Sequence, residues 1–447
     1  PGLGYSPYQA YSSIAGNPLL IDLRALVDRG WLSPEDLRDP PEFPDCTVDF
    51  EAVVPFKSRL LKKAARTFAR RDSDPLRSAF ARFCSEAKTW LNAFAEFAAL
   101  KEANAGCAWT HWERKTEIAA DDVLDQKFIQ FEFFRQWDSL KKYCNGRGIR
   151  IIGDLPIFVA HDSADVWSHP DLFDLDGNGN PRNVAGVPPD YFSKTGQRWG
   201  NPLYRWEEME RTGYGWWIER VRSMLRTVDI IRLDHFRGFE KYWRIPAGDP
   251  TAEDGRWVEG PGDRFFQAVR DALGLVPFLA EDLGYITPEV LALRDRWGFP
   301  GMRVLQFAFG DPSPSNPHRP YNFVRNCVVY TGTHDNDTSA GWFSSLSRSA
   351  EGRKELERAL LYMGSDGKDP VRDFIRLALS SIADYAILPM QDILGLGSEA
   401  RMNLPGTVEN NWRWRLRADQ LSGETASRLR ELNRIYGRLP EDGDISG

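Results

Sequence analysis

The sequence lacks long apolar runs and an excess of positive charge. No stretch of roughly 18 consecutive apolar residues occurs, so a membrane-spanning helix is not expected. The 57 Lys and Arg residues are outnumbered by 64 Asp and Glu residues, which gives a formal net charge of −7. An acidic chain is a poor electrostatic partner for nucleic acid or for an anionic membrane, and we expect neither as a partner.

Cysteine is also scarce. Five cysteines are scattered over 447 residues, and none forms a C-x-x-C pair. An odd number of isolated cysteines in a large chain favours a reducing compartment, with the thiols as packing residues. We therefore expect a cytoplasmic protein. The sequence begins at Pro1, which is not a translation start, so an upstream targeting segment, for instance to a plastid, is compatible with it.

Six short apolar runs recur after Gly148, and each carries polar residues toward its end. Amphipathic helical patterns lie between them, as at 213–226, 262–274 and 287–298, and Asp263 is the expected N-cap of the second of these. Strands that are apolar throughout and alternate with helices predict a parallel sheet covered by helices. The six runs span residues 149–158, 228–235, 277–284, 302–311, 327–337 and 385–392.

Two α/β architectures fit this alternation: an open doubly wound sheet and a TIM (β/α)₈ barrel. A doubly wound nucleotide-binding fold needs a glycine-rich loop after one strand. Neither G-x-G-x-x-G nor G-x-x-x-x-G-K-[ST] occurs. We therefore favour the barrel, with the six runs as its strands 3 to 8.

The chain divides into three regions by composition. Residues 1–56 are rich in Pro, Gly, Ser and Asp and predict loops. Residues 57–145 carry helical patterns, at 74–103 and 123–144, and predict a helical subdomain inserted in the barrel. Residues 146–447 then supply the catalytic core.

Carboxylates stand near the ends of four of the predicted strands, at Asp154, Asp234, Glu281 and Asp335. The ends of parallel barrel strands meet at one rim, so these acids are expected to converge. Clustered carboxylates cost electrostatic energy unless they are paired or used. Arg232 points to the same side of its strand as Asp234 and should hold that carboxylate ionised. The apolar residues before Glu281 should raise its pKa by desolvation.

Two carboxyl groups whose pKa values are pushed apart form the acid–base pair of glycoside chemistry. The leaving sugar oxygen must be protonated as the anomeric carbon is attacked, so one carboxyl group must be protonated and the other ionised at the same pH. In the retaining mechanism, the carboxyl groups of Asp234 and Glu281 should lie about 5–5.5 Å apart. Each acid taken alone also fits a helix cap or an ordinary ion pair, but the neighbouring His235 and His334 favour a site.

A divalent-metal hydrolase is an alternative, because His-Asp pairs occur at residues 161–162 and 334–335. The chain has only six histidines and no H-x-H or H-x-x-x-H spacing, so no metal is expected. The stretch DLDGNGN at 174–180 resembles half of an EF-hand loop. Its twelfth position is Ala185 in place of Glu, and a polar turn is the better interpretation.

Eight segments in chain order carry a more specific pattern. They are SPYQAYSSIAGNPLLIDL (6–23), GDLPIFVAHDSADVW (153–167), VAGVPPDYFSKTGQRWGNPLYRW (184–206), IIRLDHFRGF (230–239), FLAEDLG (278–284), TGTHDNDT (331–338), LPMQDILGLGSEARMNLPGT (388–407) and NWRWR (411–415). Together they resemble the 4-α-glucanotransferases called amylomaltase or disproportionating enzyme, relatives of the α-amylase clan. The resemblance covers essentially the whole chain.

The resemblance implies roles for matching residues. Asp234 corresponds to a nucleophile that forms a glycosyl intermediate, Glu281 to the acid/base, and Asp335 to a group that stabilises the transition state. It implies no cofactor, and it implies maltooligosaccharides, starch or glycogen-type α-glucans as substrates. The segment 196–202 resembles a mobile loop over the acceptor. The residues implied to contact sugar are Tyr8, Asp154, Asp190, Gln197, Trp199, Arg232, His235, His334 and Asn403.

One departure from the family pattern concerns the start of the chain. The family begins with a strand-helix-strand segment before the SPYQ motif, whereas only five residues precede Ser6 here. We therefore expect the first two barrel strands to be missing from this chain. Retaining 4-α-glucan transfer is the favoured function. A hydrolase of the same clan and a truncated, non-catalytic glucan-binding remnant are the alternatives.

Overall fold

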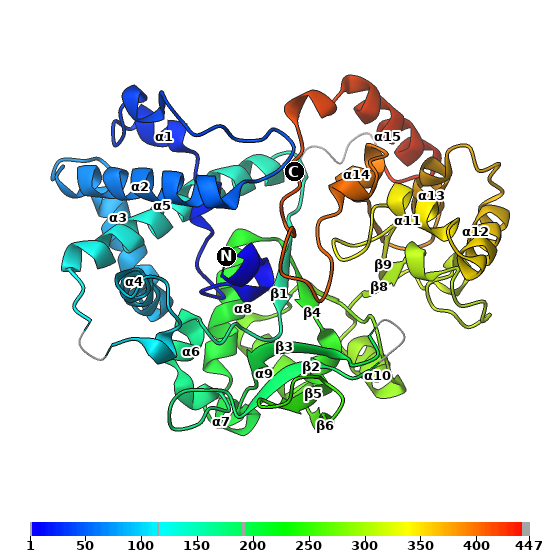
Figure 1. Ribbon diagram of the computed structural model, residues 1–447, viewed down its shortest axis with the longest axis horizontal. Helices are drawn as coiled ribbons and strands as arrows, with labels where there is room; N and C mark the ends of the chain where they lie inside the picture. Colours follow the sequence, from blue (N-terminus) through cyan, green and yellow to red (C-terminus); the bar gives the residue numbers. More distant parts are fainter. Residues whose placement is uncertain (1, 114–115, 190–192, 440–447) are drawn as a thin grey trace. The chain divides into compact units, whose positions relative to one another are not determined.

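The computed structural model describes residues 2–113, 116–189 and 193–439. The chain forms two compact units (Figure 1). The first comprises Pro1–Phe43 and Asp49–Phe278, and the second comprises Pro44–Val48 and Leu279–Gly447. Within the described residues, every helix is too short or too polar to span a bilayer.

A helical layer forms the first part of the first unit, after the short helix α1 (Leu23–Asp28). Its members are α2 (Phe50–Ala69), α3 (Arg77–Glu86), α4 (Lys88–Ala103) and α5 (Ala120–Asn145). The pattern at 74–103 predicts one helix, but the structure has two. Ala87 leaves helical geometry at φ −90° and ψ 5°, and this break lets α3 and α4 both pack against α5.

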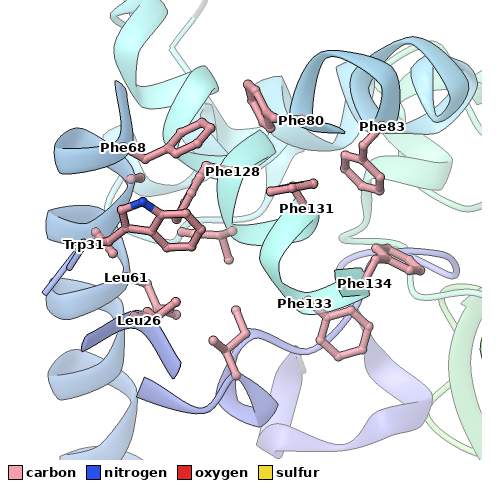
Figure 2. Close-up of a cluster of buried hydrophobic side chains, with 14 of the residues drawn as sticks. Leu26, Trp31, Leu61, Phe68, Phe80, Phe83, Phe128, Phe131, Phe133 and Phe134 are labelled. Carbon is pink, nitrogen blue, oxygen red and sulfur yellow. The ribbon is translucent and has the colours of Figure 1, made fainter. Parts of the chain in front are cut away.

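Aromatic side chains hold this layer together (Figure 2). Trp31, Phe68 and Phe128 pack with ring centroids 4.9–5.4 Å apart, partly edge to face. Phe80 and Phe131 extend the cluster at 5.5 Å. The rings come from α2, α3, α5 and the loop after α1, so the cluster joins segments that are distant in sequence and stabilises the layer by apolar burial.

Parallel strands follow the helical layer. In the first unit, β1 (Ile152–Pro156) pairs with β4 (Ile230–Asp234), which places Asp154 opposite Arg232 and Pro156 opposite Asp234. Ile231 donates its N–H to the carbonyl of Pro277, 3.0 Å away, just before β7 (Phe278–Ala280). Helices of this unit are α6 (Ala164–Ser168), α7 (Trp206–Arg211), α8 (Gly215–Thr227) and α9 (Gly262–Leu273).

The second unit continues from β7. There β7 pairs with β8 (Gly301–Val304), β8 with β9 (Cys327–Tyr330), and β9 with β10 (Tyr385–Ile387), all parallel. All six predicted strands are thus confirmed. Its helices are α10 (Pro288–Arg296), α11 (Ser339–Leu346), α12 (Ala350–Met363), α13 (Pro370–Leu379), α14 (Met390–Ile393) and α15 (Gly423–Ile435).

Strand order separates the two architectures that the sequence left open. Within each unit, each described parallel strand neighbours the next one along the chain, as β1-β4-β7 and as β7-β8-β9-β10. A doubly wound sheet reverses its order at a switch point, whereas a barrel does not. The arrangement therefore fits the barrel type.

Two local expectations were wrong. The segment expected as a loop at 196–202 contains a strand, β3 (Gln197–Pro202), in an antiparallel sheet ordered β3-β2-β5-β6. The other strands of that sheet are β2 (Asn183–Val187), β5 (Lys241–Pro246) and β6 (Arg256–Glu259). Asp263 was the expected N-cap of α9, but the helix begins at Gly262, after Pro261, so Asp263 lies in its first turn. The proposed domain boundaries at 56 and 145 stay a prediction.

The aromatic cluster gives a stability prediction. Phe128→Ala removes a ring that is 1% exposed and should lower the free energy of unfolding of the first unit by about 3–5 kcal/mol. Leu140→Ala, on the exposed side of the same helix, is the matched control and should change it by less than about 0.5 kcal/mol. Urea unfolding followed by tryptophan fluorescence measures the free energy of unfolding of both variants. Equal decreases would show that the aromatic cluster does not stabilise the helical layer.

Candidate functional site

A compact charge cluster lies at the end of β1 and β4 in the first unit. Arg232 donates from Nε to Oδ1 of Asp154 at 2.7 Å and from Nη2 to Oδ2 of the same residue at 2.6 Å. The same Nη2 reaches Oδ1 of Asp234 at 3.1 Å. The parallel register puts Asp154 directly opposite Arg232, and the alternation of side chains along β4 puts Asp234 on the same face. One guanidinium thereby holds two carboxylates.

Tyr8 completes this cluster. Its hydroxyl donates to Oδ2 of Asp154 and lies 3.2 Å from Nη2 of Arg232. Burial, with the charges of Asp154 and Asp234, raises the pKa of Tyr8 far above its usual value, so the phenol stays protonated. The structure thus brings together four residues that the sequence analysis named, from segments that lie more than 220 residues apart.

The segment 6–13, which carries Tyr8, is fastened to the first turn of α6. Oδ2 and Oδ1 of Asp165 accept from the N–H and the hydroxyl of Ser13, each at 2.7 Å. The N–H of Ala164 donates to the carbonyl of Tyr11 at 2.8 Å. Sequence reasoning missed these positioning residues, although Asp165 lies inside one of the recognised segments, because a serine–carboxylate contact over this distance leaves no local pattern.

His235 follows Asp234 directly and adopts a left-handed backbone with φ 50° and ψ 51°. Trp199 of β3 stands edge to face with its ring, with centroids 4.8 Å apart and planes at 87°. The indole N–H of Trp199 donates to Oε1 of Gln197 at 3.2 Å. Loss of hydration and the charge of Arg237 lower the pKa of His235 to about 3, so the ring is neutral near pH 7. Asp190 lies outside the described residues.

In the second unit, Glu281 comes directly after β7, and its Oε1 accepts the N–H of Leu283 at 2.9 Å. The next residue, Asp282, is 5% exposed and serves a different purpose. It pairs with Arg294 of α10 and accepts the N–H of Met302 of β8 at 2.6 Å. This buried ion pair fixes the backbone next to Glu281, and the sequence analysis did not single it out.

Asp335 lies after β9 in a separate polar group of the second unit. Its Oδ1 accepts from Nδ2 of Asn403 at 2.6 Å and lies 3.5 Å from Nε2 of His334. Arg401 donates to the carbonyls of Asp335 and Asn403 at 2.7 and 2.8 Å. The ring of His334 packs against Trp412, with centroids 5.4 Å apart. The structure thus gathers three predicted residues and adds two that prediction missed.

The chain is similar to known proteins in both sequence and structure. The family described as 4-alpha-glucanotransferase matches residues 2–421. The chain is 49% identical to the 4-alpha-glucanotransferase of Thermus thermophilus, over 98% of this chain and 90% of that protein. It is 48% identical to the 4-alpha-glucanotransferase of a Synechocystis species, over 98% and 88%. The structure of amylomaltase from Streptococcus agalactiae in complex with acarbose superposes with a TM-score of 0.92 at 35% identity, covering 98% and 90%. This match and the parallel strands fit an α/β fold of the TIM-barrel type.

The lowered pKa of His235 predicts a pH dependence of stability. The unfolded chain takes up a proton near pH 6.5, whereas folded His235 does so only near pH 3. Stability should therefore fall as the pH drops from 6.5 toward 3, by at most about 1.4 kcal/mol per pH unit from this group. His235→Asn keeps a residue type that tolerates the left-handed backbone and removes the titration. Urea unfolding at pH 7, 6 and 5 should show a shallower loss for the variant, and parallel curves would contradict the buried neutral imidazole.

Proposed function

We propose a mechanism for this chain from the premise that it belongs to the 4-alpha-glucanotransferase family. The enzyme transfers a segment of an α-1,4-glucan, from a maltooligosaccharide or a starch- or glycogen-type chain, to the 4-hydroxyl of glucose or of another glucan. Transfer proceeds with retention through a covalent intermediate on Asp234. The ion-paired state of Asp234 is the observation that most supports this proposal.

Asp234 is the nucleophile in this proposal because its surroundings favour a reactive carboxylate. Arg232, whose side chain is 11% exposed, is 3.1 Å from Oδ1 and favours the negatively charged form. The Asp234 side chain is 25% exposed, which leaves it accessible to a substrate. Asp154 shares the same guanidinium, so a covalent bond on Asp234 would remove one of two negative charges without leaving Arg232 unpaired.

Glu281 is the acid/base. In the first half-reaction, an oxygen of Asp234 bonds to the anomeric carbon while Glu281 gives its proton to the departing glycosidic oxygen. In the second, the acceptor 4-hydroxyl gives its proton to Glu281 as its oxygen attacks the anomeric carbon, and the bond to Asp234 breaks. Asp335, with Asn403 and His334, binds sugar hydroxyls as the positive charge develops on the ring.

Acceptor choice distinguishes this enzyme from a hydrolase. The Trp199 ring is held against His235, and a sugar ring stacked on its face would displace water from the intermediate. Tyr8, Asp154, Arg232 and His235 are proposed to surround the donor sugar, and Gln197 and Trp199 the acceptor. Glucose without longer products from maltotriose would instead identify a hydrolase, and binding without turnover would identify a glucan-binding remnant.

Two substitutions test the catalytic assignment in a maltotriose assay with products resolved by chain length. The wild type should produce glucose, maltose and longer maltooligosaccharides. Asp234→Ala should abolish transfer, and Glu281→Gln should lower it by roughly 10²–10⁴-fold, the usual contribution of general acid–base catalysis. Asp271→Ala, an exposed acid on α9, is the control and should behave as wild type.

Intact-protein and peptide mass spectrometry tests the covalent step. Glu281→Gln, incubated with maltosyl fluoride, should accumulate glycosyl units on the peptide that contains Asp234, because fluoride departs without an acid whereas the step that releases the sugar needs the missing base. Near-normal transfer by either variant, or a label on another peptide, would overturn the assignment.

A further inference from the structure

A pocket lies in the first unit and shares no residue with the charge cluster of Asp154, Arg232 and Asp234. Its volume is about 990 Å³, which is in the range of ligand-binding pockets. Trp109 and the turn 174–179 line it, together with Pro170 and Phe173. Arg182 and Arg205 lie at its exposed side.

The Trp109 wall is held in place by several independent contacts. Its indole N–H donates to the carbonyl of His161 at 2.8 Å, and its backbone N–H donates to Oδ1 of Asp162 at 3.3 Å. Asp162 pairs in turn with Lys101 at 2.5 Å, and Lys101 is only 6% exposed. A partly exposed tryptophan whose indole N–H and backbone N–H are both hydrogen-bonded is a preorganised flat surface. The His-Asp pair at 161–162 therefore builds this wall.

The second wall, the turn 174–179, is equally ordered. Oδ1 of Asp176 accepts the N–H groups of Asn178 and Asn180 at 2.8 and 2.9 Å, which closes the polar turn expected from DLDGNGN. Gly179 lies so close to the Trp109 ring that an added Cβ would be 2.4 Å from it. His161 Nε2 contacts the carbonyl of Gly179 at 2.8 Å. The two walls are thus fastened to each other before any ligand arrives.

The charges of the lining indicate the kind of ligand. Two acids, Asp174 and Asp176, balance two bases, Arg182 and Arg205. The backbone N–H groups of Asn180 and Asn178 lower the pKa of Asp176, which keeps it ionised. A balanced set of fixed donors and acceptors disfavours a phosphate or a metal cation and suits a neutral ligand with many hydroxyl groups. The aromatic wall suits the flat apolar face of a sugar ring.

We propose that this pocket is an auxiliary binding site for α-glucan chains, distinct from the catalytic residues. Trp109 stacks on a sugar ring, and the side chains of Asp174, Asp176, Arg182 and Arg205 bind its hydroxyls. The site holds a long glucan and raises its effective concentration at the enzyme, whereas a trisaccharide gains little from it. The choice of α-glucan as ligand rests on the proposed function.

A pair of glycines provides the test. Gly177 lines the pocket and Gly248 lies in the loop between β5 and β6. Both have open space around an added Cβ, and neither has a left-handed φ, so a leucine is tolerated at each. Gly177→Leu should place a bulky side chain in the pocket and raise the apparent Kd for amylose, measured by retardation in native gels, by roughly 3- to 10-fold, as expected for loss of one aromatic contact. Gly248→Leu should match wild type.

Kinetics then separate this site from the catalytic one. Gly177→Leu should keep the wild-type kcat and KM for maltotriose and should raise KM for amylose. Trp109→Ala, which removes the stacking surface, should show the same pattern. Retardation of Gly177→Leu equal to wild type, or no retardation of the wild type, would overturn the proposal, as would a changed KM for maltotriose. Absence of maltotriose transfer by the wild type would contradict the proposed function while the amylose measurement still decides on the pocket.

Discussion

The pairing of one largely buried guanidinium with two carboxylates is the interaction on which the candidate site of the first unit depends. Arg232 contacts Asp154 through both oxygens and Asp234 through one. Removing one partner of such a buried group leaves a charge without compensation, which is far more costly than losing a surface ion pair. The register of β1 with β4, the backbone of β4 and the position of Tyr8 must therefore all keep their side chains within hydrogen-bond distance of Arg232.

Several neighbouring residues hold the segments that carry Asp154 and Tyr8 in place. Arg220, which is 2% exposed, donates to the carbonyl of Pro156 at 2.6 Å, at the end of the strand that carries Asp154. Its ring neighbours are tryptophans, with Trp217 4.6 Å from the guanidinium carbon. Asp165 holds Ser13 and so the segment that delivers Tyr8. These residues contact the segments that carry Asp154 and Tyr8, and they restrict where those two side chains can lie.

The acids near the ends of the predicted strands are either buried or exposed in the structure. Asp392 and Asp282 are 2% and 5% exposed, and their bonds go to the chain itself. Asp392 accepts from Thr331 and Ser339 and so connects the end of β9 to the start of α11. Asp335 keeps a side chain that is 48% exposed. Exposure therefore distinguishes an acid that holds strands together from one that can meet a ligand.

The sequence by itself determined the six parallel strands, most of the helices between them and the segments that carry the candidate residues, because apolar periodicity and contiguous motifs are local properties. It did not determine the break at Ala87, the strand at Gln197–Pro202 or the contacts of Asp165, Arg220 and Arg401. Those depend on which distant segments meet. The tertiary structure also decided that Asp282 is a buried ion-pair partner, whereas the neighbouring Glu281 stays partly exposed. Adjacent acids look alike in a sequence, and burial and hydrogen-bond partners, which only packing supplies, make them different.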